Sequence, residues 1–187
     1  DPALTATVTG VPTNGVAPTY SLSRVAGQDV NEYAITVTAE ASSNPNYTVA
    51  VEGGTLKIEP KAVTVSVADA ADVEYDGSAH ESDKPVVFDG IVDGETASIS
   101  YTAAKGTVVG TYTGSYGDDF AVAKADGSDS TGNYTLTTKT PGKLTITDRT
   151  EKYEITVVAT SNTGNTYDGT EKSATGFETL EFTVEGN

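Results

Sequence analysis

The sequence repeats itself, and this repetition limits the possible folds more than any other feature. The repeated motifs are Gly-x-x-Val-x-x-Tyr at 27–33 and 106–112, Asn-Tyr-Thr at 46–48 and 133–135, Leu-x-Ile at 56–58 and 144–146, and Tyr-Asp-Gly at 75–77 and 167–169. The spacing between copies grows from 79 to 87, 88 and 92 residues, and only across stretches typical of loops. The sequence therefore predicts a tandem array, an arrangement that usually provides length, spacing or multivalent contact.

The repeat also predicts where one unit ends and the next begins. The first unit comprises residues 1–60 and lacks an opening strand, the second is complete over 61–148, and 152–187 is the start of a third. The charged connection between the second and third units is too short to act as a flexible tether. We therefore expect the units to meet end to end in a semi-rigid rod.

Alternation of apolar and polar residues predicts β-strands along the whole chain. The predicted strands are Thr5–Thr9, Tyr33–Thr38, Tyr47–Val51, Val63–Val67, Ile99–Tyr101, Tyr134–Thr138 and Ile155–Val157. Turn signals such as Asn14-Gly15 and Asp76-Gly77 separate them. The pattern favours an all-β chain of small antiparallel, Ig-like sandwiches. The alternative is a β-grasp-like sheet, but 61–148 contains no periodic segment of helical length.

Composition excludes several classes of function. The formal net charge of −16 opposes binding to nucleic acid, whose phosphates favour Lys and Arg, and binding to anionic lipid. The absence of cysteine excludes disulfides, thiolate nucleophiles and cysteine metal sites. No stretch approaches the ~20 apolar residues of a membrane span. The charge is explained by solubility and by repulsion between repeated modules.

Catalysis has little support in the sequence. His80 is the only histidine, so a nucleophile–histidine pair would depend on one residue of a predicted loop. The acidic pair Asp118-Asp119 is expected by chance among 27 acidic residues, and neighbours on a strand point to opposite faces. We expect neither an enzyme nor a cofactor.

One loop carries a metal-site hypothesis. Asp126, Asp129 and Asn133 offer hard oxygen ligands of the kind that calcium prefers. The loop does not fit the EF-hand pattern, because Thr137 stands where glutamate is required. The alternative is a polar insertion without a ligand. A Lys–Asn bond from Asn133 to one of three lysines is a further possibility, and the candidates are Lys57, Lys61 and Lys143.

The order of the motifs within a unit is also informative. An opening strand is followed by Tyr-Asp-Gly and Ser or Thr, then Gly-x-x-Val-x-x-Tyr, Asn-Tyr-Thr and a closing Gly-x-Leu-x-Ile strand. This order resembles the MBG/YDG-type repeats of bacterial cell-surface proteins, and residues 1–5 resemble the segment after the Tyr-Gly-Asp opening of that family. The resemblance covers essentially the whole chain, although 80–84 is idiosyncratic.

The resemblance implies a non-catalytic stalk of a secreted or surface-anchored bacterial adhesin, located outside the cell. A binding module for host glycans or proteins is the alternative. The expected partners are neighbouring repeats of the same protein. Because the tyrosines recur at equivalent positions, we expect them to fill a thin core rather than to stack on sugars.

The two ends of the chain predict self-association. The first unit lacks the strand and turn that residues 61–77 supply to the second, and the third unit begins with such a strand. An unpaired strand edge favours pairing with another chain, and an isolated hairpin is only marginally stable. The sequence therefore predicts a head-to-tail contact in which one chain completes the first unit of another. The alternative is a fragment, or a first unit that tolerates the loss.

Overall fold

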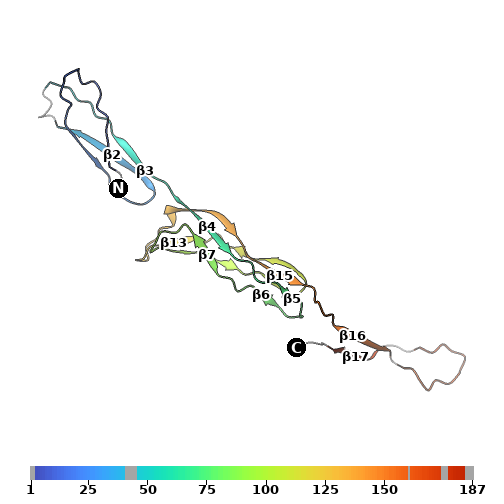
Figure 1. Cartoon of the computed structure of the whole chain (residues 1–187). Helices are drawn as coiled ribbons and strands as arrows, with labels where there is room; N and C mark the ends of the chain where they lie inside the picture. The colour runs from blue at the N-terminus through green and yellow to red at the C-terminus, as the bar shows by residue number, and fades with distance from the viewer. Residues whose placement is uncertain (1–2, 41–45, 160, 174–176, 184–187) are drawn as a thin grey trace.

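The chain forms an elongated succession of small β-sheets (Figure 1). The computed structural model describes residues 3–40, 46–159, 161–173 and 177–183. These residues contain strands and a 3-10 turn, η2 (Thr131–Asn133), but no α-helix, so none of them lies in a helix that would be able to cross a membrane. The all-β prediction is confirmed. Asp1 and Pro2, which belong to the family resemblance, lie outside the described residues.

The first unit contains an antiparallel sheet in the order β1-β2-β3. Its strands are β1 (Tyr20–Arg24), β2 (Asn31–Ala39) and β3 (Gly54–Ile58). Alternation along β2 turns every second side chain toward one face. On that face Tyr33 is buried, whereas Ile35 and Val37 are only half-buried. One face of this sheet is therefore incompletely covered.

The described part of the second unit forms five small sheets. Its strands are β4 (Lys61–Val67), β5 (Val73–Glu74), β6 (His80–Glu81), β7 (Val86–Asp89), β8 (Thr96–Ser98), β9 (Tyr101–Thr102), β10 (Lys105–Gly106), β11 (Gly110–Thr113), β12 (Ser115–Tyr116), β13 (Ala121–Ala123), β14 (Tyr134–Thr140) and β15 (Lys143–Thr147). The three-stranded sheets have the orders β14-β4-β7 and β11-β15-β5. The pairs β10-β6, β12-β9 and β13-β8 complete the set.

Two strand pairs depart from the antiparallel expectation. β14 runs parallel to β4, and β15 runs parallel to β5. Parallel neighbours require a crossover connection, which the long stretch between β4 and β14 provides. The opening segment (β4, β5) and the closing segment (β14, β15) therefore run in the same direction. The chain enters this unit at one end and leaves it at the other. The Ig-like assignment stays a prediction.

The core of the second unit follows from the alternation in β4. Val63, Val65 and Val67 are buried while the residues between them are exposed. Val63 packs with Val122 and Tyr134, and partly buried apolar side chains surround this cluster. Leu144 and Ile146 of β15 are buried in the half of the unit that leads to the third unit.

Repetition in sequence becomes repetition in strand register. In the first unit Tyr33 pairs with Leu56, and in the second Tyr112 pairs with Leu144 at the equivalent positions. The third unit contributes β16 (Glu154–Ala159) and β17 (Phe177–Thr183). From Thr156 to Val158 their pairing repeats that of β4 with β7 in the same register, 92 residues later, and a register shift follows at Ala159. The repeat found in the sequence is thus a repeat of backbone pairing.

The Gly-x-x-Val-x-x-Tyr motif has a packing role in both copies. The Tyr33 hydroxyl donates to the Asp29 carbonyl at 2.7 Å, and the Tyr112 hydroxyl donates to the Val108 carbonyl at 2.9 Å. Each ring lies so close to the motif glycine, Gly27 or Gly106, that a Cβ there would overlap it. The repeated glycine is required because the tyrosine ring takes the space of its side chain.

Three predicted strands are wrong. Ile99–Tyr101 spans the break between β8 and β9, so that only Tyr101 lies in a strand. Residues Thr5–Thr9 and Tyr47–Val51 lie in irregular segments. The corresponding segments of the second unit are β7 and β14, and both hold their extended form by pairing with β4 between them. No strand occupies that middle position among the described residues of the first unit. Alternation alone does not make a strand when the partner is missing.

Candidate functional site

A hydrogen-bonded contact joins the first unit to the second. The Val30 N–H donates to Asn133 Oδ1 at 2.7 Å, and Asn133 Nδ2 donates to Asp29 Oδ1 at 2.8 Å. Lys124 Nζ donates to the same Asp29 oxygen at 3.0 Å. The asparagine of the Asn-Tyr-Thr motif therefore bridges two neighbouring repeats.

Local structure on both sides positions these groups. Asp29 and Val30 belong to the turn between β1 and β2, which the Tyr33 hydroxyl holds through the Asp29 carbonyl. Asn133 lies at the end of η2, and its Nδ2 also donates to the Ser130 hydroxyl at 3.2 Å. The buried Ser130 donates in turn to Glu95. The junction is built on residues that are fixed within their own units.

The electrostatics of this junction favour the ionised pair. The pKa of the Asp29 carboxyl is lowered, first by the hydrogen bond from Asn133 and then by the hydrogen bond and charge of Lys124. The pKa of Lys124 is raised by its hydrogen bond to Asp29. Because both side chains are exposed to solvent, we expect the pair to orient the units more than to stabilise either fold.

Aromatic and polar contacts join the second unit to the third. The rings of Tyr75 and Tyr153 meet edge to face, with centroids 6.4 Å apart. The guanidinium of Arg149 lies 4.4 Å from the centroid of Tyr153. The Thr150 hydroxyl donates to Glu74 Oε1 at 2.6 Å, and this bond lowers the pKa of Glu74. Both connections between units are therefore held by side chains.

The structure gives the calcium candidates a role in turns. The Asp126 carboxylate accepts hydrogen bonds from the backbone N–H and the hydroxyl of Ser128. The Asp76 carboxylate accepts one from the Ser78 N–H in the same way. Asp129 accepts both donors of Thr131 in the same way. Hydrogen bonds from these donors lower the pKa of Asp126 and of Asp129.

Two of the candidate ligands, Asp129 and Asn133, line one small cavity at the junction together with Asp29. Asn133 is at the junction, and the described residues contain no group of three or more His, Cys, Asp or Glu side chains that is able to hold a metal ion. The calcium hypothesis stays a prediction. The Lys–Asn bond also stays open, and Lys57, one of its candidates, pairs with Glu59 at 2.6 Å.

The turn and calcium hypotheses for Asp126 can be separated by experiment. We expect Asp126→Ala to lower the thermal midpoint slightly, with and without millimolar calcium, because it removes the acceptor that closes the turn. Asp126→Asn should retain the midpoint, since an amide oxygen closes the same turn. If calcium raises the midpoint of the unaltered chain and both variants lose that gain, the loop binds calcium.

The groups considered for catalysis make hydrogen bonds and ion pairs with other side chains and with the backbone. His80 lies in β6 rather than in a solvated loop, and its Nε2 lies 2.9 Å from Asp76 Oδ1. Asp119 accepts the Ser100 N–H and hydroxyl, while Asp118 pairs with Lys139. These contacts connect turns and neighbouring strands.

Sequence reasoning missed most residues of the junctions. Asp29 lies inside the Gly-x-x-Val-x-x-Tyr motif, but its equivalent in the second unit is Val108, so no repetition pointed to it. Lys124 lies in the insertion that makes the second unit longer than the first. Arg149 lies in the short charged connection between the second and third units. A signal was available in Asn133, which recurs as Asn46 in the first unit.

Comparison with known proteins gives one match. Residues 1–57 match the family model of the MBG domain, YGX type. This match confirms the resemblance to MBG-type repeats and suggests a repeat domain of surface proteins. No curated protein and no solved structure matches the chain.

Proposed function

We propose that this chain is a non-catalytic spacer, part of the stalk of a secreted or surface-anchored bacterial protein of the adhesin class. The observation that carries the proposal is the parallel course of the opening and closing segments in the second unit. A unit that the chain enters at one end and leaves at the other adds its full length to an array. The extracellular location follows from the family resemblance.

The side-chain contacts at both junctions support the same function. A stalk must keep its direction from one unit to the next, and short connections without contacts would allow bending. Asn133 fixes the first unit on the second through two hydrogen bonds, and the Tyr75–Tyr153 pair supports the second connection. The acidic surface, with a net charge of −16, discourages collapse of one unit onto another.

A binding module for host glycans or proteins is the second candidate. Such a module would present an aromatic side chain that its sibling units do not present. Tyr167 meets this criterion, because it is almost fully exposed whereas its equivalent in the second unit, Tyr75, packs on Tyr153. Glycan-array binding is the measurement that tests this candidate against the spacer.

The spacer proposal predicts an elongated particle in solution. A compact protein of this length would have a radius of gyration of about 16 Å. We expect small-angle scattering to give a clearly larger value and a distance distribution with a long tail (Figure 1). A compact, spherical profile would contradict the proposal.

The first junction provides a variant for the same measurement. Asn133→Ala should broaden the distance distribution, because it removes both hydrogen bonds to the first unit. Asn46→Ala changes the equivalent, exposed asparagine of the first unit and is the control.

Acid should broaden the distance distribution as Asn133→Ala does. Because folding lowers the pKa of Asp29, the ionised carboxylate stabilises the junction at pH values above the ordinary aspartate pKa. This stabilisation is lost below about pH 4.

A further inference from the structure

A carboxylate inside the second unit is connected through a serine to the asparagine of the first junction. Glu95 Oε1 accepts the Ser130 hydroxyl at 3.0 Å, and Glu95 Oε2 accepts the Tyr134 hydroxyl at 2.5 Å. The Ser130 oxygen accepts in turn from Asn133 Nδ2 at 3.2 Å. Ser130 is 3% exposed, so its hydroxyl is shielded from solvent. Two hydrogen bonds therefore connect Glu95 to Asn133.

The donor and acceptor roles along this chain of bonds follow from Glu95. An ionised carboxylate only accepts, and a hydroxyl has one proton to donate. Because Ser130 gives its proton to Glu95, its oxygen is left to accept on the side of Asn133. Burial, and then the bond to Glu95, raises the pKa of Tyr134, so this hydroxyl keeps its proton for the other carboxylate oxygen. The carboxylate therefore orients both hydroxyls that face it.

An amide can turn its oxygen or its nitrogen to a given neighbour, and only one orientation of Asn133 suits the junction. Since Ser130 accepts, Asn133 turns Nδ2 toward it and Oδ1 toward the Val30 N–H, 2.7 Å away. The second Nδ2 proton is donated to Asp29 at 2.8 Å. The opposite orientation would place nitrogen against the Val30 N–H and oxygen against the Asp29 carboxylate. The orientation selected by Ser130 is therefore the one that joins the units.

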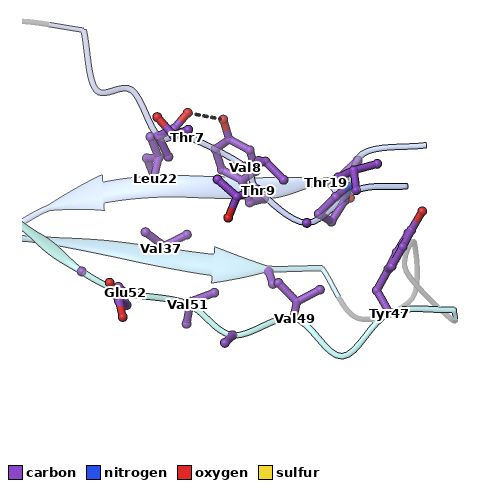
Figure 2. A pocket seen from close by; sticks show the side chains of 18 of the residues that line it. Thr7, Val8, Thr9, Thr19, Leu22, Val37, Tyr47, Val49, Val51 and Glu52 are labelled. Carbon is purple, nitrogen blue, oxygen red and sulfur yellow. Dashed lines mark hydrogen bonds between the residues drawn. The ribbon is translucent and has the colours of Figure 1, made fainter. Parts of the chain in front are cut away.

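The turn that contains Glu95 also forms without a carboxylate. The Glu95 N–H donates to the Val92 carbonyl at 3.0 Å. In the equivalent turn of the first unit, 80 residues earlier, the Gly15 N–H donates to the Pro12 carbonyl at 2.8 Å. Figure 2 shows the ring of Tyr47, from the first Asn-Tyr-Thr motif, at one end of the cavity along that unit. Its hydroxyl lies beside Gly15. The turn and its tyrosine neighbour therefore do not require a carboxylate.

We propose that Glu95 is the positioning residue of the first junction: its carboxylate fixes the proton of Ser130 and thereby the orientation of Asn133. The inference rests on the proposed spacer function, because a spacer needs one direction from unit to unit. The second unit holds the asparagine in its binding orientation before the first unit contacts it. Less side-chain freedom is then lost when the contact forms.

Glu95→Gln tests the proposal, because glutamine has the same shape but replaces one acceptor oxygen with a donor. With its oxygen on the Tyr134 hydroxyl, its nitrogen donates to Ser130, and the Ser130 proton turns toward Asn133. The Asn133 amide then turns over, and the Val30 N–H loses its acceptor. We expect deuterium exchange of the Val30 amide to become about three- to tenfold faster, the effect of losing one hydrogen bond.

Two further variants separate positioning from charge and from stability. Tyr134→Phe removes the other partner of Glu95 but leaves Ser130 its acceptor, so Val30 exchange should change about twofold at most. Glu95→Gln combined with Tyr134→Phe frees the glutamine oxygen for the Ser130 hydroxyl and should recover about half or more of the lost protection. The double variant has the same charge as Glu95→Gln, so this recovery is independent of the attraction between Glu95 and Lys124.

The Tyr75 amide is the internal reference. Its N–H donates to the Thr147 carbonyl at 3.0 Å, at the end of the second unit that leads to the third. Its exchange should change about twofold at most in each variant. If Glu95→Gln does not fold, Ser130→Ala takes its place, because it removes the acceptor that orients Asn133 and should accelerate Val30 exchange in the same way.

Three results would overturn the proposal. The first is unchanged Val30 exchange in Glu95→Gln or in Ser130→Ala. The second is equal acceleration of the Val30 and Tyr75 amides, which would indicate a general loss of stability. The third is a double variant in which Val30 exchanges faster than in Glu95→Gln alone.

Failure of this inference is distinguishable from failure of the spacer proposal. Small-angle scattering of the unaltered chain tests the spacer, whereas Val30 exchange tests Glu95. An elongated chain whose Val30 exchange is insensitive to Glu95→Gln retains the spacer and overturns the positioning role. A compact unaltered chain overturns the spacer, and the exchange experiment still decides whether Glu95 orients Asn133.

Discussion

Replacing Ile146 with alanine is expected to lower the free energy of unfolding by about 2–5 kcal/mol, the range for removing a large aliphatic side chain from a packed core. Ile146 is 1% exposed and lies in β15, which pairs with β11 on one side and with β5 on the other. The opening segment therefore closes the core over it, and the cavity left by the substitution has little room to collapse. Denaturant unfolding followed by circular dichroism would measure the loss.

The equivalent residue of the first unit is the control. Ile58 ends the same Leu-x-Ile motif, but it is only half-buried, and among the described residues β3 pairs with β2 alone. Ile58→Ala should therefore cause a smaller loss than Ile146→Ala. Equal losses would mean that the opening segment does not determine burial in a unit.

The sequence predicts those strands whose partners lie in the same unit. β2 and β4 were predicted because apolar alternation and a neighbouring strand agree. The segment Tyr47–Val51 has the same alternation as Tyr134–Thr138 but is irregular, because strand form also depends on a partner that alternation does not reveal. The parallel direction of β14 was missed for a related reason: direction depends on the path of the chain between two strands.

The junctions were less predictable than the strands. The Asp29–Asn133 bond joins residues 104 positions apart, and nothing in either local sequence specifies the other. Asp126 illustrates a different difficulty, since a carboxylate that closes an Asp-Gly-Ser turn and one that binds calcium have the same local sequence. The structure shows the Asp29–Asn133 contact directly. The choice between the two roles of Asp126 requires the calcium titration.

Replacing Gly142 with alanine is the second substitution with a large expected effect. Gly142 is buried between β14 and β15, where the closing segment passes the opening segment. A Cβ at this position would lie 2.6 Å from the Ala68 carbonyl oxygen and 2.8 Å from a methyl group of Val67. Because one obstacle is backbone, the side chain cannot rotate away, and the two segments must separate. We expect a loss of about 3 kcal/mol, the upper end of typical overpacking.

Gly54→Ala is the matched control, since Gly54 begins the same Gly-x-Leu-x-Ile motif in the first unit. A Cβ there would meet only the Ile35 side chain, at an ordinary contact distance of 3.8 Å. The substitution should be neutral or should stabilise the chain by up to about 1 kcal/mol, because alanine has less conformational freedom to lose on folding. A loss as large as that caused by Gly142→Ala would mean that contact with the opening segment is not the reason why Gly142 must lack a side chain.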